Sequence, residues 1–362
     1  MKIQEIDKNF DFATSLTRKD IAIYNVLEEP FKIYGLILPK DDNDSFHRLP
    51  YEVAESVNPG VKELNLNTSG GRVRFSTDSD YIAIRAEIHT HCKVSFFSFT
   101  GIMGFDLYVE EDGKQKFVRP FIPSLDAETS YEAEITTVEG GKMRDYTINF
   151  PAYSGVKSLY VILNDKAKVQ SAREYTKSVP VLYYGSSITQ GGICSRPGNI
   201  YQNIISRRLD CDYVNLGFSA SAKGETEIAE YISKQKMSVF VYDYDHNAPT
   251  VEHLENSHES MFKIIRSSQP ELPIICVSRP DYAHGEDAQK RREVIMKTVE
   301  NAKALGDKNV CFVDGGKFCE DFGAGDSISV DSVHPNDLGF MCMANHIGAE
   351  IDKILNGGEY NG

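Results

Sequence analysis

The feature that most constrains the fold of this chain is a change of rhythm near residue 179. Beyond that point, short apolar runs alternate with longer segments of helical periodicity. The apolar runs span residues 179–185, 212–218, 238–245, 272–278 and 309–316, and the helical segments span 199–209, 224–235, 250–268, 287–305 and 337–355. Strands that alternate with helices of this length predict a parallel sheet covered on both faces. We therefore expect a three-layer α/β domain over residues 179–362.

The first half of the chain has the pattern of an all-β domain. Residues 72–88, 105–121 and 131–150 each alternate apolar and polar positions around a central turn, and 156–163 closes the series. This pattern predicts hairpins within a β-sandwich or jelly roll. The chain has 362 residues, more than one hydrophobic core usually serves. We expect two domains, over residues 1–178 and 179–362.

Charge and hydropathy exclude several classes of partner. The formal net charge is −14, which disfavours both nucleic-acid backbones and anionic membranes. Residues 1–16 lack the apolar run of a secretory signal, and no stretch approaches the 18 apolar residues of a membrane span. We expect a cytoplasmic protein that acts without a membrane or nucleic acid.

The sequence offers no convincing metal or cofactor site. Its seven cysteines are scattered without a C-x-x-C pair, which predicts free thiols in a reducing compartment rather than zinc ligands or disulfides. His89 and His91 would share one face of a strand, but no carboxylate or third ligand lies near them in the sequence. A P-loop and an H-E-x-x-H motif are also absent. We expect no cofactor and no metal.

The stretch "GSSIT", residues 185–189, directly follows the first strand of the α/β half. A serine in this position can be an ordinary helix N-cap. It can also be a nucleophile, provided that a base and an orienting acid reach it. Asp331 and His334 have the three-residue spacing that lets a carboxylate take the imidazole Nδ1–H while Nε2 faces a serine. With Asn247 after another strand, this set favours Ser187 as a nucleophile.

In order and spacing, these residues resemble the four blocks of the SGNH (GDSL-type) hydrolase superfamily. "GSSIT" resembles the first block, "NLGFSASAKGE" (215–225) the second, "DYDHNAP" (243–249) the third and "DSVHP" (331–335) the last. "GFDLY" (104–108) is similar to the G-x-D-L-Y signature of a β-sandwich domain that precedes some SGNH domains. The resemblance implies a flavodoxin-like sheet in the second half of the chain.

The resemblance also implies a serine esterase mechanism and its residues. Ser187, His334 and Asp331 would form the catalytic triad, and the backbone N–H groups of Ser187 and Ala220 with the Asn247 amide would form the oxyanion hole. Two positions depart from the family pattern, because Ser186 replaces its usual Asp and Ala220 its usual Gly. If the backbone must adopt a positive φ at Ala220, an L-residue costs on the order of 1–2 kcal/mol there. If not, the methyl group only narrows the pocket.

The substrate inferred from the resemblance is a small acyl ester, chiefly acetyl, on a carbohydrate. Polar loop residues suit a hydroxyl-rich leaving group, namely Arg196, Asp245, His246, Arg279 and Asp281. Each is also compatible with being an ordinary loop charge. Three alternatives stay open: acyl transfer at the same site, a lipase for longer acyl chains, and a catalytically silent binding protein. The leading domain is expected to wall the active site or to mediate self-association into a homo-oligomer.

Overall fold

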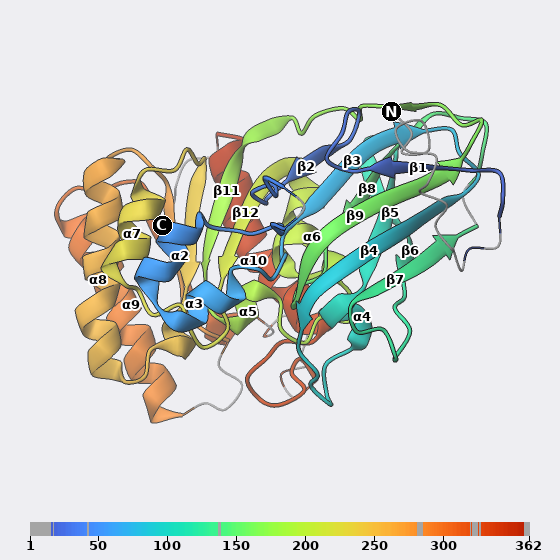
Figure 1. Cartoon of the computed structure of the whole chain (residues 1–362). Helices are drawn as coiled ribbons and strands as arrows, with labels where there is room; N and C mark the ends of the chain where they lie inside the picture. Colours follow the sequence, from blue (N-terminus) through green and yellow to red (C-terminus); the bar gives the residue numbers. More distant parts are fainter. Residues whose placement is uncertain are drawn as a thin grey trace. The chain divides into compact units, whose positions relative to one another are not determined.

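The computed structural model describes residues 16, 18–41, 43–136, 139–280, 285–318, 320, 325 and 327–357. These residues form two compact units (Figure 1). Unit 1 contains the described residues up to Arg48 together with Leu66–Glu174 and Ser195–Gly198. Unit 2 contains Leu49–Asn65, Tyr175–Cys194 and the described residues from Asn199 onward. The chain therefore passes between the units more often than a single boundary near residue 178 would require.

Unit 1 is built from two antiparallel sheets, as the alternating pattern predicts. The first has the order β1(Ile21–Asn25), β9(Ser154–Asn164), β4(Ile82–His91), β7(Ser130–Ile135). The second has the order β10(Val169–Gln170), β3(Arg72–Thr77), β8(Arg144–Asn149), β5(Phe105–Glu111), β6(Lys114–Phe121), with β2(Lys32–Tyr34) also paired to β3. One short helix, α4(Phe99–Met103), precedes β5.

Only one of the three predicted hairpins forms. β5 and β6 pair around Asp112 and Gly113, which both have the positive φ that a tight two-residue turn needs. By contrast, β3 and β4 belong to different sheets, and so do β7 and β8, so the predictions of hairpins over 72–88 and 131–150 are wrong. The turn at 78–81 contains no residue with positive φ, so the chain leaves β3 for the other sheet instead of folding back.

Unit 2 contains the predicted parallel sheet. Its order is β12(Cys211–Gly217), β11(Lys177–Gly185), β13(Val239–Asp243), β14(Ile274–Val277), β15(Val310–Val313), and every pairing is parallel. Numbered along the chain, this is the flavodoxin-like order 2-1-3-4-5. In such a sheet the connections leave the first strand in opposite directions, so ligands bind beyond the carboxyl ends of β11 and β13. The prediction of an α/β fold is confirmed.

Helices cover both faces of this sheet (Figure 1). On one face, α7(Thr226–Ser233), α8(Val251–Ser268) and α9(Glu286–Ala304) pack in a layer. On the other face, α6(Tyr201–Leu209) packs with α10(Asp337–Leu355). The strands supply alternate side chains to the two faces, with Leu182 and Tyr184 in the first core and Tyr183 stacked edge-on against Tyr201 in the second.

Two short helices in unit 2 are absent from the sequence-based expectation. α2(Tyr51–Val57) and α3(Pro59–Leu64) come from the first half of the chain, yet Ala54 and Val61 are buried in the core of the α/β unit. Each helix has two turns or fewer, too short for a helical period to stand out in the sequence. The remaining short elements are α5(Ser187–Gln190), η1(Pro197–Asn199), η2(Asp245–Asn247) and η3(Gly315–Lys317).

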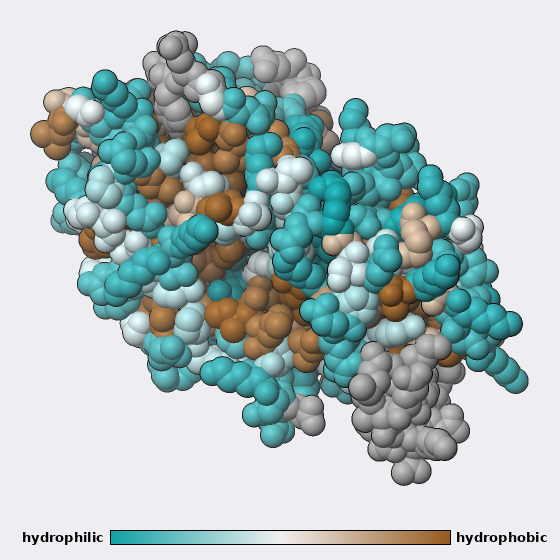
Figure 2. Space-filling view, turned by 90° about the horizontal axis from the view of Figure 1, so that it is seen from above, coloured by the Kyte–Doolittle hydropathy of each residue, from teal (hydrophilic) through white to brown (hydrophobic). Residues whose placement is uncertain are grey.

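The surface view turned from Figure 1 shows a face that is mostly hydrophilic, with apolar residues in separate areas between charged ones (Figure 2). No helix among the described residues is both long and apolar enough to cross a membrane. The six cysteines that the structure describes are all free, and Cys319 lies outside the described residues.

Candidate active site

The two adjacent serines at the end of β11 have different places in the structure. Ser186 is the N-cap of α5, and its hydroxyl accepts a hydrogen bond from the Ile188 backbone N–H at 3.2 Å. Ser187 is the first residue of the helix, and its side chain is therefore left for another partner. The N-cap interpretation therefore holds for Ser186, and the nucleophile interpretation stays a prediction for Ser187.

Ser187 Oγ lies 2.8 Å from His334 Nε2. The other ring nitrogen, Nδ1, lies 2.7 Å from Asp331 Oδ2. Ser187 is 8% exposed, so the hydroxyl is sheltered but not sealed from solvent. The structure thus brings together the three residues predicted as a triad, with the imidazole between the hydroxyl and the carboxylate.

Asp331 is held in place by the turn that follows it. Its Oδ1 accepts hydrogen bonds from the backbone N–H groups of Val333 at 3.0 Å and His334 at 2.7 Å. Ser332 between them has a φ of 63°, the left-handed conformation that folds the turn back onto the carboxylate. Partial burial raises the pKa of Asp331, but the hydrogen bonds from His334 and Val333 outweigh it and leave the pKa below its ordinary value. The carboxylate is therefore charged at neutral pH and can stabilise an imidazolium.

The loop that carries Ala220 is hydrogen-bonded both to Asn247 and to the helix that begins at Ser187. Asn247 on η2 donates its side-chain amide to the Phe218 carbonyl at 2.9 Å. The next residue in that loop, Ser219, donates its backbone N–H to the Gln190 side chain of α5 at 2.9 Å. Ala220 follows with a φ of 53°, and among the described residues its N–H has no hydrogen-bond acceptor. Of the two possibilities considered for Ala220, the positive φ indicates backbone strain at an L-residue.

Buried amide side chains pin the helix that carries Ser187. The Thr189 carbonyl accepts hydrogen bonds from Gln202 on α6 and Asn215 on β12, both at 2.8 Å. Gly217 packs so closely on this helix that a Cβ there would lie 2.2 Å from the Gln190 nitrogen. The position of Ser187 is thus set by residues that sequence reasoning missed, although a glycine in a short strand is a signal of close backbone contact.

Asp245, His246 and Arg279 gather at the same edge of the sheet. Asp245 is 1% exposed, and its Oδ2 accepts the Arg279 backbone N–H at 3.2 Å. Burial raises its pKa to about 6. Burial also lowers the pKa of His246 to about 3, and the nearby Arg279 and His334 add to this effect. Arg279 donates to Asp287 at 3.1 Å. A direct substrate contact of these residues stays a prediction. The Arg279 side chain is partly exposed, and Asp281 lies outside the described residues.

Arg196 makes contacts that need no substrate. Its guanidinium donates to Asp106 Oδ2 at 2.7 Å and to the Tyr108 hydroxyl at 2.6 Å, and it lies 3.8 Å from the centre of the Phe117 ring. Asp106 and Tyr108 are the Asp and Tyr of the "GFDLY" stretch. These contacts within unit 1 account for the position of the guanidinium, so that position gives no support to the predicted substrate contact.

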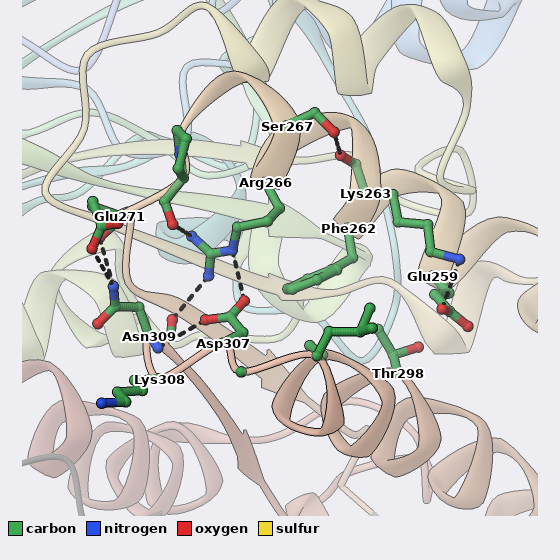
Figure 3. Close-up of a pocket in the computed structure, with 14 residues that line it drawn as sticks. Glu259, Phe262, Lys263, Arg266, Ser267, Glu271, Thr298, Asp307, Lys308 and Asn309 are labelled. Atoms are coloured by element: carbon green, nitrogen blue, oxygen red, sulfur yellow. Dashed lines mark hydrogen bonds and ion pairs between the residues drawn. The ribbon is translucent and has the colours of Figure 1, made fainter.

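One groove in unit 2 lies away from this site. It has a volume of about 500 Å³ and is lined by the last turns of α8 and α9 and by residues before β15 (Figure 3). Arg266 at its centre is engaged by Asp307 and by backbone carbonyls, including that of Leu272 at 2.6 Å. Because these residues precede β14 and β15, the groove is at the amino edge of the sheet, whereas Ser187 and His334 lie at the carboxyl edge. It is not the candidate active site.

No metal site competes with the triad within the described part of the chain, where groups of three metal-binding side chains are not found. The His91 ring instead packs edge-on against Phe99, with 6.1 Å between the ring centres.

A flavodoxin-like sheet with a serine–histidine–aspartate set beyond the carboxyl ends of its strands is an arrangement typical of hydrolases. Residues 177–352 match the GDSL-like lipase/acylhydrolase family, and residues 21–169 match the GxDLY family, the N-terminus of SGNH-hydrolase-type esterases. The chain therefore belongs to the SGNH (GDSL-type) hydrolases with a GxDLY N-terminal domain, and it is a carboxylic ester hydrolase. The recognition made from its sequence motifs is confirmed.

Solved structures with the same fold cover nearly the whole chain. A GDSL-like lipase from Bacteroides ovatus is 26% identical, with a TM-score of 0.82 over 93% of this chain and 98% of its own. The salicylyl-acyltransferase SsfX3 of a tetracycline biosynthetic pathway is 20% identical, with a TM-score of 0.75 over 94% and 99%. The acetyl xylan esterase Est2A from Butyrivibrio proteoclasticus is 12% identical, with a TM-score of 0.60 over 93% and 99%. Comparison with curated protein sequences finds no match.

Proposed function

We propose that the protein hydrolyses small acyl esters, chiefly acetyl esters of carbohydrates, through an acyl-enzyme. The observation that carries the proposal is the continuous chain from Asp331 through His334 to Ser187, with both polar contacts below 3 Å. A serine hydroxyl becomes a nucleophile only when a base takes its proton, and an acidic residue must hold that base in the right orientation.

The reaction follows from this arrangement in two steps. In the tautomer whose Nδ1–H donates to Asp331, His334 Nε2 accepts the proton of Ser187 as Oγ attacks the ester carbonyl. The imidazolium then protonates the leaving alcohol, and the acyl group remains on Ser187. Water attacks this acyl-enzyme with His334 again as base, which releases the acid and restores the serine.

The tetrahedral intermediates carry an oxyanion that needs donors. We assign them to the backbone N–H groups of Ser187 and Ala220 and to the Asn247 side chain. Support comes from Asn247, which gives one amide hydrogen to Phe218 and keeps its second for a ligand, and from the unused N–H of Ala220. Each such donor contributes about 2.7–4 kcal/mol to lowering the barrier.

The carbohydrate part of the proposal has weaker and separate support. The acetyl xylan esterase Est2A shares the fold of the whole chain, and the partly exposed Arg279 stands near the triad as a donor for a sugar hydroxyl. For the N-terminal unit we retain the jelly-roll arrangement of its two sheets as part of the proposal.

Turnover of p-nitrophenyl esters of increasing acyl length tests the reaction. We expect wild-type activity to fall steeply beyond acetate, and Ser187→Ala to lower kcat by at least about 10⁴-fold. A preference for medium chains would indicate a lipase instead. Acetate release from acetylated xylan, mannan and pectin fragments then identifies the carbohydrate. Activity retained by Ser187→Ala would refute the triad assignment.

Acyl transfer is the second candidate, and the observation that favours it is the fold shared with the salicylyl-acyltransferase SsfX3 over 94% of the chain. Both reactions use the same acyl-enzyme and differ in what attacks it. Adding alcohols and amines to the p-nitrophenyl acetate assay separates them. A hydrolase forms mainly acetate at all acceptor concentrations, whereas a transferase forms the acetylated acceptor and turns over slowly without it.

A further inference from the structure

A buried carboxyl group lies directly behind the nucleophile turn. Asp243 is the last residue of β13, the strand next to β11, and it is 6% exposed. The Thr189 hydroxyl donates to its Oδ1, the Tyr201 hydroxyl lies 3.3 Å from its Oδ2, and the backbone N–H of Ser186 also bonds to the carboxyl group. The triad mechanism makes no use of this group.

The contacts of Asp243 lie on both sides of Ser187. Ser186 immediately precedes the nucleophile, and Thr189 lies two residues after it on α5. The Thr189 carbonyl is fixed separately by Gln202 and Asn215, so its hydroxyl is presented to β13 in one orientation. A single carboxyl group therefore clamps the two ends of the short segment that carries Oγ.

The packing around this clamp leaves no spare room. A Cβ on Gly185 would lie 1.8 Å from Asp243 Oδ1 and 2.1 Å from Thr189 Oγ1. Glycine at 185 is therefore required so that the carboxyl and hydroxyl groups can meet beneath the end of β11. In the "GSSIT" stretch, Ser186 stands where the family pattern has an aspartate. Asp243 on the neighbouring strand β13 supplies a carboxyl group to this turn instead.

We propose that Asp243 is a positioning residue that fixes Ser187 for attack by holding Ser186 and Thr189 from β13. This inference rests on the proposed esterase reaction and assigns a role to a residue outside the triad and the oxyanion hole. The group acts through the turn and touches neither the substrate nor the reacting atoms.

The carboxyl group is neutral while it does so. Its pKa is raised to about 8, chiefly by burial and also by the Asp245 carboxyl, although the hydrogen bonds from Thr189, Tyr201 and Ser186 act in the opposite direction. An uncharged amide of the same shape should therefore substitute for it at pH 7.

The test compares two matched pairs of variants, Asp243→Asn with Asp243→Ala and Thr189→Ser with Thr189→Val. The readouts are kcat and KM for p-nitrophenyl acetate, and the rate at which a fluorophosphonate labels Ser187. We expect Asp243→Ala and Thr189→Val to lower kcat and labelling roughly 10- to 100-fold, as displacement of a catalytic group by about 1 Å does. Asp243→Asn and Thr189→Ser should stay close to wild type, and KM should change little in all four.

Ser278→Ala is the control for a general loss of stability. Ser278 is also buried at a strand end, where its hydroxyl accepts the Gly315 N–H at 2.9 Å. It should lower the melting temperature without changing labelling. Should Asp243→Ala fail to fold, the Thr189 pair decides alone, because valine and threonine have similar volumes.

Unchanged kcat and labelling in Asp243→Ala and Thr189→Val, with melting temperatures lowered as in Ser278→Ala, would overturn the inference. Absence of both turnover and labelling in the wild-type protein would instead overturn the proposed function, and the inference with it. The two failures are therefore distinguishable.

Discussion

Ala220 holds a conformation that its side chain disfavours. Its φ of 53° lies in the left-handed region, where an L-residue is strained by about 1–2 kcal/mol. Glycine occupies this region freely, at the cost of greater chain entropy in the unfolded state. The strain is retained at a position whose N–H we assign to the oxyanion, which is a common place for stored backbone strain.

Replacing Ala220 by glycine should stabilise the protein. We expect Ala220→Gly to raise the free energy of unfolding by about 0.5–1 kcal/mol, because relief of the strain exceeds the entropy cost. Urea denaturation measures the change. Ala304→Gly, at the exposed end of α9, is the matched control and should lower stability by about 0.5–1 kcal/mol. Equal losses in both variants would show that the φ of residue 220 is not a source of strain.

The raised pKa of Asp243 makes stability depend on pH. In the unfolded chain this carboxyl loses its proton near pH 4, whereas in the folded protein it does so at about pH 8. Between these values the folded state binds the extra proton, so the free energy of unfolding falls as pH rises and levels off above about pH 8.

Asp243→Asn should flatten this decline. Asp245, whose pKa is raised to about 6, contributes a decline of the same sign in both proteins, so the difference between them isolates Asp243. Unfolding by urea at intervals from pH 4 to pH 9 measures it. Parallel curves for the two proteins would mean that the Asp243 pKa is not raised.

At the scale of elements, the stability of the short helix α5 depends strongly on its N-cap, Ser186. It has only four residues, so the hydrogen bond from Ile188 to the Ser186 hydroxyl is a large part of what starts it. Ser187 has no such role, since its hydroxyl is turned to His334.

Substitutions of the two serines should therefore affect different quantities, namely the stability of the protein for Ser186 and its turnover for Ser187. Ser186→Ala should cost about 1 kcal/mol of stability, the usual value of an N-cap, and lower kcat only partly. Ser187→Ala should leave the melting temperature nearly unchanged while turnover is lost. Differential scanning calorimetry together with the p-nitrophenyl acetate assay checks both. A larger loss of stability in Ser187→Ala than in Ser186→Ala would reverse the assignment.

Elements also show where sequence reasoning succeeds. Ser187 follows a buried strand, and Asp331 and His334 share one turn, so the proximity of the three residues could be predicted from short patterns. Asp243 ends an apolar strand and could have been noticed as a carboxyl group without a nearby cation. The hairpins could not be resolved, because alternation of apolar residues is the same whether a strand pairs with its neighbour or crosses to another sheet.

At the scale of the whole molecule, Arg196 has contacts that its sequence neighbourhood does not indicate. Its partner Asp106 is 90 residues earlier in the chain, a distance over which no local pattern pairs two charges. Asp106 is fully buried and also accepts the Gly198 N–H at 2.8 Å and the Asn149 amide at 2.7 Å. The aspartate of the GxDLY signature is therefore the acceptor that holds residues 196–198 within unit 1.

Removing this acceptor should be costly. We expect Asp106→Ala to lower the free energy of unfolding by about 2–4 kcal/mol, because it removes a buried acceptor shared by a partly buried guanidinium and two amide donors. Glu128→Gln, which breaks the exposed pair with Lys93, should change stability by at most about 1 kcal/mol. Chemical denaturation of both variants measures the contrast, and similar small losses would show that the signature aspartate has little structural weight.

The division of the chain into units bears on how such proteins can be recombined. Segment 49–65 leaves the N-terminal half to join the α/β unit, and segment 195–198 leaves the C-terminal half to join the β unit. A gene cut near codon 178 would thus give two fragments that each lack a piece of their own fold. A leading domain transplanted from this chain would carry Asp106 but not residues 195–198, so we expect a functional exchange to need both segments.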